Sequence, residues 1–582
     1  MIFITALLMT SQSNHKFHLL AALSVIIVLV FDVFFAFQKE GYHMDEILSY
    51  ELSNSEFTPW ITPTQPEGRL EKYYRNEIHG DSFAKTVSNL FGQVADILKN
   101  RGASVAASYT ADVYDEPQWM SEEDITRYVT FYGEDSVLAL SAYYNTTTDN
   151  HPPLYFMLLN IISAVWSLFA HGTLSVWPGV ILNMIFMAGS MLVICGFFKD
   201  IVHKSQLGPL AALIYGLSPA GLNTVLLIRM YSMTSFFCLA FTYVLFLKLT
   251  REGDARYKNK LFILVTVLGF LTQYFVCIYY FFLALCVFVY LIRTGKKELL
   301  KGFVRSLVIS AVIGVILYPF VYHDMFGTTI GDSVMENMAG FGGYIEKILL
   351  FGSIMARKCA GNVPVFCLLI AAALLSIVIS VKTKQMKAWA IIPAISAAAY
   401  FLVVSKIAPY TVDRYMMPVF GVVIVWIVIA VSFLVKAAAD KLIKSENSAN
   451  KVLTALYIAV AALCLIFAFV KDPDYLYRGY EAQLKISERY EDYDAVVVYE
   501  GTSFYQNVPE LMNYNNCLLV NKSELPMYNE ILASHNEIIV IEGDGVDRDE
   551  VLVTLGDMYG YTSLTVLMED GVFGDRVCLL SK

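Results

Sequence analysis

Charged side chains are scarce in this sequence. They make up 16% of the 582 residues, whereas hydrophobic residues make up 57% and the mean hydropathy is +0.54. A soluble globular domain carries about 25% charged residues. The shortage of charge therefore excludes an ordinary soluble protein and predicts a polytopic α-helical membrane protein.

Several motifs are also missing. No C-x-x-C occurs, which disfavours zinc and redox sites, and the net charge of −10 disfavours nucleic acid as a partner. Two cysteines near the end of the chain, Cys517 and Cys578, would pair only if their strands were neighbours. Most of the others lie in apolar runs, where cysteine behaves as a small hydrophobic residue; these are Cys195, Cys238, Cys277, Cys286, Cys367 and Cys464.

Long apolar runs predict about eleven membrane spans, because a helix needs about 20 apolar residues to cross a hydrocarbon core about 30 Å thick. The run 261–292 is too long for one span and predicts two. The other predicted spans are 19–37, 177–198, 208–228, 230–249, 303–323, 361–381, 388–405, 416–435 and 452–470.

Basic residues near the span ends predict the orientation, since such residues stay on the cytoplasmic side. Clusters around Lys199, Arg256, Lys297, Lys384 and Lys441 place residues 1–18 in the cytoplasm and the chain after 471 outside the cell membrane. Both ends of the first loop are then external. The apolar segment 152–170 cannot cross once between them, so we expect an interfacial or re-entrant helix there.

Two external portions flank a transmembrane domain predicted at 19–470. The first loop, 38–176, is too long for a connector and is expected to carry interfacial helices. The tail, 471–582, predicts a small α/β domain, because β-rich runs alternate with helix-like stretches such as 547–558. It lacks G-x-G-x-x-G and P-loop motifs, so we expect a supporting domain. The β-rich runs are 495–499, 517–520, 538–541, 564–567 and 577–580.

Polar residues next to the apolar runs fall on the external side and define a candidate site. Ionisable groups at membrane depth are costly and are usually functional. Asp45 and Glu46, directly after the first span, would form an acidic wall, and Lys406 with Arg414 a basic wall. The remaining candidates are His151, Arg229, Tyr231, Gln273, Tyr274, Tyr410 and Tyr415.

Four elements resemble the membrane glycosyltransferases of the GT-C superfamily. "DE" follows the first span, "HPPLY" ends the first loop, "SP" is followed ten residues later by "RMYS", and "RYMMP" occurs late in the chain. The pattern is most similar to family 39 and its bacterial relatives, which include protein O-mannosyltransferases and the aminoarabinose transferase of lipid A. The resemblance covers about residues 19–435 and implies a GT-C-like catalytic domain.

The resemblance implies transfer of a sugar from a polyprenyl phosphate to a lipid, glycan or protein acceptor at the outer membrane face. Asp45 looks like the catalytic acidic residue, with Glu46 beside it, and Arg414 with Tyr415 looks like the motif that meets the lipid phosphate. Two positions depart from the pattern. Many bacterial relatives have glutamate where this chain has Leu227, and many have histidine where it has Gln273.

The residue types fit this chemistry. A carboxylate such as Asp45 can accept the acceptor's proton, which contributes about 10²–10⁴ in rate. Cations such as Arg414 and Lys406, with Arg229 as a third candidate, would stabilise the leaving phosphate. A single base predicts direct displacement with inversion. We assign no metal site, and a divalent cation at the acidic wall stays open as a cofactor.

Each candidate also has a purely structural reading. The acidic pair could be a solvated helix exit, His151 could orient the following Pro–Pro turn, and Arg414 could reach to lipid headgroups. Gln273 and Tyr274 fit a turn. The competing function is a transporter or glycolipid flippase, although the two similar halves typical of transporters are not evident. A sensor or assembly protein anchored by the helices is a third alternative.

The orientation can be checked with reporter fusions. A reporter fused after Lys471 should be external, and one fused near Lys258 internal, because the basic clusters are expected to stay in the cytoplasm. Activity of a cytoplasmic reporter fused after Lys471 would overturn the orientation.

Overall fold

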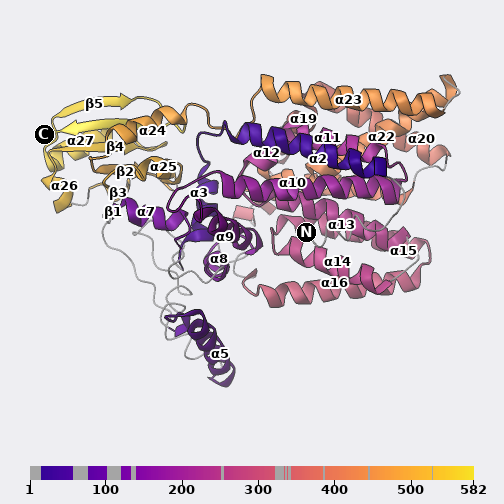
Figure 1. Ribbon diagram of the computed structural model, residues 1–582, viewed down its shortest axis with the longest axis horizontal. Coiled ribbons are helices and arrows are strands. Elements are labelled where there is room, and N and C mark those ends of the chain that lie inside the picture. Colours follow the sequence, from indigo (N-terminus) through magenta and orange to yellow (C-terminus); the bar gives the residue numbers. More distant parts are fainter. Residues whose placement is uncertain are drawn as a thin grey trace. The chain divides into compact units, whose positions relative to one another are not determined.

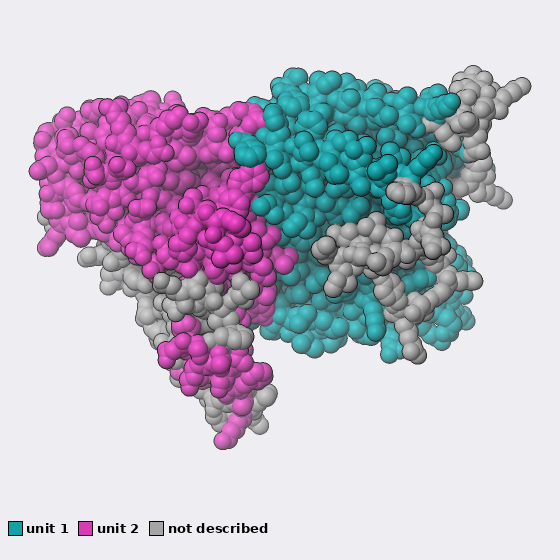
Figure 2. Space-filling model, in the orientation of Figure 1, with its two compact units in different colours: residues 1–37, 150–155, 180–474 teal, residues 38–149, 156–179, 475–582 magenta. Residues whose placement is uncertain are grey.

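The computed structural model divides the chain into two compact units, coloured separately in Figure 2. We call residues 1–37, 150–155 and 180–474 the helical unit, and residues 38–149, 156–179 and 475–582 the mixed unit. The structure describes residues 15–56, 77–100, 119–132, 139–250, 255–321, 333–334, 337–338, 342–383, 387–442, 446–501, 503–526 and 529–582.

The helical unit is built from long apolar helices, many of which run alongside one another (Figure 1). Among the described residues, nine helices are long and apolar enough to cross a membrane, so the predicted polytopic helical fold is confirmed. The helices of this unit are α2 (His15–Ala36), α10 (Trp177–Phe197), α11 (Leu207–Leu217), α12 (Pro219–Leu226), α13 (Tyr231–Thr250), α14 (Ala255–Phe270), α15 (Phe275–Arg293), α16 (Lys297–Leu317), α19 (Tyr344–Ala360), α20 (Val363–Thr383), α21 (Ala388–Ile407), α22 (Met417–Leu442) and α23 (Glu446–Val470).

Two short helices bear on the predicted number of spans. The run 261–292 does contain two helices, α14 and α15, but α14 has 16 residues and is about 24 Å long, short for a 30 Å core. The segment 152–170 forms α9 (Leu154–Ser167), whose 14 residues reach about 21 Å. Its length fits the interfacial or re-entrant helix expected from the sequence.

The predicted span 208–228 is broken into α11 and α12, which meet at 60°. Ser218 ends α11 and begins α12, where its hydroxyl accepts a hydrogen bond from the Gly221 amide at 3.2 Å. Pro219 occupies the first turn of α12, a position where its missing N–H costs nothing. A Cβ atom on Gly221 would lie 2.2 Å from the Tyr215 carbonyl oxygen. The sequence therefore specifies this bend.

The mixed unit combines the first loop and the tail (Figure 1). The loop contributes the short helices and one strand, and the tail contributes the rest of a six-stranded sheet with its helices. The loop elements are α3 (Met44–Asn54), α5 (Phe83–Asn100), β1 (Trp119–Ser121), α7 (Glu122–Val129), α8 (Leu140–Asn145), η2 (Thr146–Thr148) and most of α9. The tail elements are α24 (Tyr480–Arg489), β2 (Ala495–Tyr499), η5 (Ser503–Asn507), α25 (Val508–Leu511), β3 (Asn516–Asn521), α26 (Glu530–Ser534), β4 (Glu537–Glu542), α27 (Arg548–Tyr559), β5 (Ser563–Met568) and β6 (Arg576–Ser581).

The sheet has the strand order β1-β3-β2-β4-β6-β5. Strands β2, β3 and β4 are parallel and the other pairs are antiparallel. All five strands predicted in the tail are present. β1, in which Met120 pairs with Cys517 of β3, was not predicted. Cys517 and Cys578 lie on β3 and β6, which β2 and β4 separate, and both are free thiols.

Candidate active site

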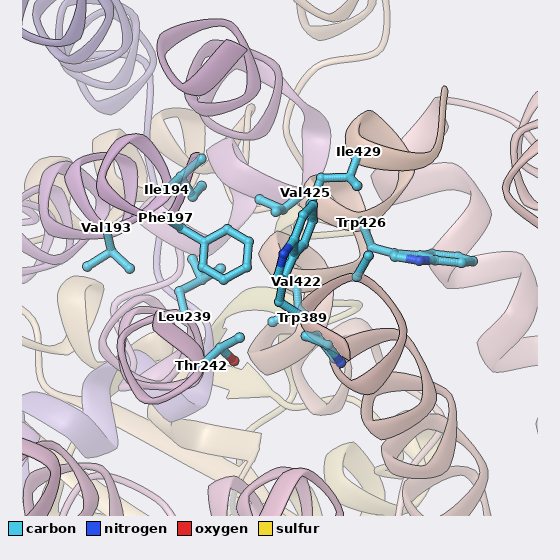
Figure 3. Close-up of a pocket in the computed structure, with 12 residues that line it drawn as sticks. Val193, Ile194, Phe197, Leu239, Thr242, Trp389, Val422, Val425, Trp426 and Ile429 are labelled. Carbon is cyan, nitrogen blue, oxygen red and sulfur yellow. The ribbon is translucent and has the colours of Figure 1, made fainter. Parts of the chain in front are cut away.

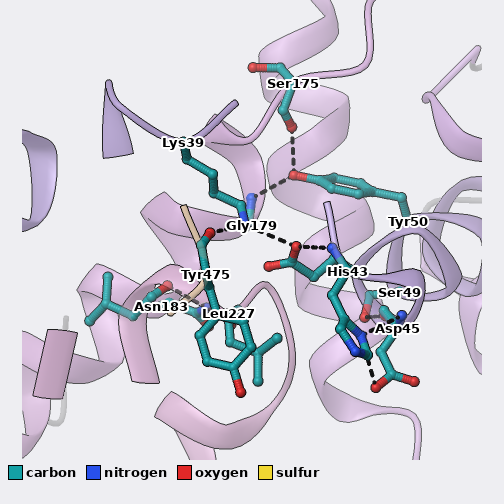
Figure 4. A network of polar contacts seen from close by, with 12 residues as sticks. Lys39, His43, Asp45, Ser49, Tyr50, Ser175, Gly179, Asn183, Leu227 and Tyr475 are labelled. Atoms are coloured by element: carbon teal, nitrogen blue, oxygen red, sulfur yellow. Dashed lines mark hydrogen bonds and ion pairs between the residues drawn. The ribbon is translucent and has the colours of Figure 1, made fainter. Parts of the chain in front are cut away.

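Helix α3, which carries Asp45 and Glu46, begins with a reciprocal cap. The His43 Nδ1 atom accepts a hydrogen bond from the Asp45 amide at 3.1 Å, and the Glu46 carboxylate accepts one from the His43 amide at 2.7 Å. These contacts satisfy amide groups that a helix start leaves without partners. The first turn of α3 is thereby fixed (Figure 4).

A buried ion pair holds this cap in place. Lys39 Nζ lies 2.9 Å from Glu46 Oε2, and neither side chain is exposed. Lys39 also donates to the Tyr475 carbonyl at 2.7 Å (Figure 4). Burial lowers the pKa of Lys39, and the Glu46 carboxylate opposes that shift. The ion pair joins the end of the first predicted span, α3 and the start of the tail.

The two adjacent carboxylates therefore have different environments. Glu46 is fully buried and bound to Lys39 and the His43 amide. The Asp45 side chain is 15% exposed, and its Oδ2 atom lies 3.3 Å from His43 Nδ1. Of the two carboxylates, Asp45 has part of its surface open, whereas Glu46 is used in holding the start of the helix.

In the helical unit, Arg229 lies in the tight connection between α12 and α13, and only 5% of it is exposed. Asn183, a buried residue of α10, holds this connection. Its amide donates to the Val225 and Leu227 carbonyls at 3.0 and 2.7 Å, and its own carbonyl accepts from Ser232 at 2.8 Å. The Asn183–Leu227 contact is drawn in Figure 4. The position of Arg229 thus depends on a side chain about 45 residues earlier in the chain.

Arg414 and Tyr415 form a short 3-10 turn, η4 (Asp413–Tyr415), between α21 and α22. The Tyr415 hydroxyl is bonded to the Arg414 guanidinium, and the charges of Arg414 and Arg229 both act on it. Burial raises the pKa of Tyr415, and these two cations oppose the shift. Tyr231, at the start of α13, lies within electrostatic range of Arg229, Asp413 and Tyr415. The structure therefore brings Arg229, Tyr231, Arg414 and Tyr415 together.

A second cation braces η4. Lys358, near the end of α19, lies 3.1 Å from Asp413 Oδ2 and also forms an ion pair with Asp474. The Tyr400 hydroxyl of α21 donates to the Tyr415 carbonyl at 2.7 Å. The backbone that carries Arg414 is therefore tied to both α19 and α21.

The other predicted residues have more local surroundings. Lys406 ends α21, with its ammonium 5.5 Å from the Tyr344 ring centroid, and Tyr410 is 54% exposed. The Gln273 side chain accepts a hydrogen bond from the Phe275 amide within its own turn. Tyr274 packs against Phe270 in the same turn.

His151 lies in the helical unit, directly before the Pro–Pro sequence. The Leu154 amide donates to the Leu271 carbonyl at 3.0 Å, which joins the "HPPLY" segment to the turn that contains Gln273. Among the described residues, no group of three or more His, Cys, Asp or Glu side chains is arranged to hold a metal ion.

Two apolar cavities lie in the helical unit. One cavity, of about 30 Å³, is lined by residues of α10, α13, α21 and α22, among them Phe197, Trp389 and Trp426 (Figure 3). It is too small for more than a water molecule or two. A larger one, of about 280 Å³, lies among α11, α12, α22, α23 and the α19–α20 turn. Cys359, the neighbour of Lys358, lines the larger cavity, so this cavity adjoins the helix end that braces η4.

Sequence reasoning missed three positioning residues: Lys39, Asn183 and Lys358. Asn183 carried a usable signal, since a single asparagine inside an apolar span usually bonds to a neighbouring helix. Lys39 and Lys358 resembled ordinary basic residues at helix ends. The Tyr475 carbonyl that Lys39 binds and the Asp413 carboxylate that Lys358 binds lie far away in the sequence, and nothing in the sequence marked the nearby Glu46 as buried.

No protein-family model and no curated protein matches the chain. Among solved structures it is similar to ArnT from Cupriavidus metallidurans bound to undecaprenyl phosphate, with a TM-score of 0.45 and 11% identity over 74% of this chain and 88% of that one. For the apo state of that protein the TM-score is 0.43 and the identity 12%, over 86% and 98% of the two chains. The Archaeoglobus fulgidus oligosaccharyltransferase complexed with Zn and sulfate gives 0.42 and 12%, over 73% and 64%. At this level of similarity, function has to be argued from the residues of the site.

Removing one partner of the buried ion pair should strongly destabilise the mixed unit. Lys39→Met leaves Glu46 buried without its ammonium partner, and we expect a loss of about 3–5 kcal/mol. Thermal unfolding of the purified protein in detergent measures this loss of stability. Lys39→Met combined with Glu46→Gln should recover part of the loss.

The control is Lys485→Met, which breaks an exposed ion pair with Glu481 and should change little. Equal effects of Lys39→Met and Lys485→Met would mean that the buried pair does not hold α3.

Proposed function

We propose that the protein is a membrane glycosyltransferase that moves a sugar from a polyprenyl phosphate to a hydroxyl of a lipid, glycan or protein acceptor. The observation that carries the proposal is that Arg229 and Arg414 both lie near Tyr415, with Tyr231 beside Arg229, in a unit that also holds an apolar cavity of about 280 Å³. A lipid phosphate needs both features. The resemblance to family 39 of the GT-C superfamily, seen in the sequence, supports the same reaction.

Arg414 is proposed to bind the donor phosphate. A guanidinium presents a planar fork of donors that matches two phosphate oxygens, and its charge stabilises the leaving group as the sugar departs. Lys358 and Tyr400 hold the η4 turn, so the guanidinium is preorganised and little reorganisation is needed during the reaction. Arg229 would add a second positive charge. Lys406, in the last turn of α21, would add a third.

The cavity of about 280 Å³ offers room for part of a hydrocarbon chain. Its walls include Ile214, Leu369, Val428, Leu463 and Phe467, so a hydrocarbon segment inside it would contact apolar side chains. A polyprenyl chain is longer than this, and the rest of it would lie in the bilayer.

Asp45 is proposed as the base that removes the proton of the acceptor hydroxyl. Its partial exposure and the fixed start of α3 suit this role, while Glu46 is committed to Lys39. With one base and no second carboxylate assigned as a nucleophile, the reaction inverts the configuration at the sugar. We place the reaction at the outer face, with the N-terminus cytoplasmic and the tail domain extracytoplasmic, and leave the sugar and acceptor open.

A transporter or flippase remains the second candidate because two features of the helical unit favour it. The helix pair α11 and α12 is broken at a bend, as transporter helices often are. Asp32, about one turn before the end of α2, is fully buried, and neither of its carboxyl oxygens has a hydrogen-bond partner among the described residues. The tests below distinguish the two functions.

The base can be tested with Asp45→Asn. This change keeps the shape of the side chain and removes its basicity, so transfer should fall by about 10²–10⁴ while the unfolding temperature and lipid binding stay unchanged. The assay uses purified protein, a labelled polyprenyl-phosphate sugar and a set of hydroxylated acceptors in detergent. Glu46→Gln is the contrasting variant, since it should lower the unfolding temperature. Normal transfer by Asp45→Asn would leave Asp45 as a solvated helix exit.

The phosphate clamp can be tested at Arg414. Arg414→Ala should weaken binding of undecaprenyl phosphate and slow transfer, and Arg414→Lys should recover only part because one ammonium cannot replace a two-pronged guanidinium. In detergent no compartments exist, so transport makes no signal, whereas a transferase releases free polyprenyl phosphate and labels the acceptor. Translocation in vesicles that depends on Arg414, without any product from the donor and acceptor pairs, would overturn the glycosyltransferase.

A further inference from the structure

Four polar residues of the tail form a cluster with no exposed surface. Gln483 lies on α24, Asn507 ends η5, Glu510 lies on α25, and Asp575 directly precedes β6. We call these residues the acid–amide cluster. Its members come from separate elements, so their contacts connect one part of the mixed unit to another.

Each amide group of the cluster bridges both carboxyl groups. Gln483 Nε2 donates to Glu510 Oε1 at 2.9 Å and also to Asp575 Oδ2. Asn507 Nδ2 donates to the same two oxygens, at 2.6 Å and 3.0 Å. One oxygen of each carboxyl group therefore accepts two hydrogen bonds.

One oxygen of each acid and the amide oxygen of each amide in the cluster are buried and have no hydrogen-bond partner among the described residues. These four atoms are Glu510 Oε2, Asp575 Oδ1, Gln483 Oε1 and Asn507 Oδ1. Ionised carboxylates and amide carbonyls are all hydrogen-bond acceptors. With ionised acids, four buried acceptors would therefore have no donor, which costs considerable folding free energy. Gly571 lies against two of them: a Cβ atom there would be 2.3 Å from Asp575 Oδ1 and 2.9 Å from Gln483 Oε1.

Two protons would resolve this arrangement. A proton on Asp575 Oδ1 can be donated to Gln483 Oε1, which together with the existing Gln483–Asp575 bond makes a two-way acid–amide pair. A proton on Glu510 Oε2 can be donated to Asn507 Oδ1 and makes a second pair. We propose that Glu510 and Asp575 are both protonated in the folded protein, and that the cluster is a latch that opens as the protons leave at rising pH.

The charges around the cluster agree with neutral acids. Burial is the largest influence on the pKa of Glu510 and of Asp575 and raises both values, and no lysine or arginine is among the main influences on either. The backbone amides of Asp575 and Phe573, together with the two side-chain amides, lower the pKa of Asp575 in part. The Asp575 charge raises the pKa of Glu510 further, whereas the amide hydrogen bonds lower it in part. Several basic groups on the surrounding elements have other partners: Lys485 pairs with Glu481, Arg576 with Glu542, and Arg548 with Glu569 and Asp570, while Arg489 of α24 lies over the Tyr490 ring. The other titratable groups near Glu510 are Tyr480, Tyr514 and Cys517.

A cation held between the carboxylates fits less well. Amide nitrogen atoms, not oxygens, face both carboxyl groups, and an N–H group repels a cation. Binding a cation would require both amides to turn over. A chelator distinguishes a bound cation from two protonated acids, because it would remove the cation and leave the protonated cluster unchanged.

The latch affects α3 because α24, through the residues that lead into it, and η5 are both hydrogen-bonded to α3 or to the residues just before it. These two elements carry the two amide side chains of the cluster. The segment leading into α24 is bonded to the residues before α3: the Glu40 amide donates to the Leu476 carbonyl at 2.8 Å, and the Gly479 amide to Glu40 Oε2 at 2.6 Å. From η5, the Tyr505 hydroxyl donates to Glu51 of α3 at 3.3 Å. Opening the latch removes the links between α24 and η5 that run through the two carboxyl groups, leaving the Tyr480 hydroxyl bond to the Gln506 carbonyl at 3.0 Å, and so loosens both supports of α3.

The direction of the pH effect follows from the raised pKa values. The folded protein holds the protons more tightly than the unfolded chain does, so this contribution to stability is complete below the ordinary carboxyl range. It is lost as pH rises through the raised pKa values. Each proton released on unfolding changes the unfolding constant by about tenfold per pH unit.

The experiment compares thermal unfolding of the full-length protein in detergent from pH 5 to pH 9 with that of the double variant Glu510→Gln/Asp575→Asn. An amide replaces the acid O–H by N–H and keeps both directions of each pair at every pH. We expect the wild-type midpoint to fall toward pH 9 and the variant to lose that slope, with a midpoint at pH 9 equal to or above the wild type. The control is Glu481→Gln, which changes an exposed carboxyl group on α24, the helix that carries Gln483. This variant should keep the wild-type slope.

Hydrogen–deuterium exchange, corrected for the intrinsic pH effect, gives a local measurement. Peptides covering 480–489 and 503–511 should lose protection in the wild type at pH 9 and keep it in the double variant. An unchanged pH slope in the double variant would overturn the proposal. So would a wild-type midpoint that EDTA lowers and Ca²⁺ restores, because the cluster would then hold a cation.

Discussion

The buried ion pair between Lys39 and Glu46 is the constraint on which the rest of the mixed unit depends. Two charges without exposed surface are costly to remove from water, and only full pairing with additional hydrogen bonds offsets that cost. Here the Tyr475 carbonyl and the His43 amide complete the set. The pair can form only when Lys39, the start of α3 and the start of the tail meet, and all three belong to the mixed unit. It therefore fixes where α3 begins within that unit.

This constraint separates two carboxylates that look alike in the sequence. Glu46 is buried and paired, and it holds the start of the helix. Asp45 has a fixed position and part of its surface is open. A comparable division occurs in the helical unit, where Lys358 holds the η4 turn and Arg414 is carried by it. In both places one charged residue holds the backbone, and the residue proposed to act in the reaction lies on the backbone that it holds.

The sequence predicted what depends on local pattern. The apolar runs predicted the long helices, and the β-rich runs at 495–499 and 538–541 predicted central strands, since buried parallel strands are apolar on both faces. It did not predict β1, because three residues carry no periodicity and become a strand only by pairing with β3. The chain's charged candidates, such as Asp45 and Arg414, stood out against apolar surroundings. Their supports did not, because Lys39 and Lys358 look like ordinary basic residues at helix ends, and only the folded structure shows that they are buried against Glu46 and Asp413.

The edge strand β1 has a consequence for the order in which the protein is made. Met120 pairs with Cys517, about 400 residues later in the chain. At a synthesis rate of about 5–20 residues per second, roughly 20–80 seconds pass between the appearance of the two strands. During that interval the first loop has no sheet to join while the membrane helices are inserted one after another. Completion of the sheet is thus among the last events of biogenesis, and a ribosome that stops before β3 leaves β1 with its edge unpaired.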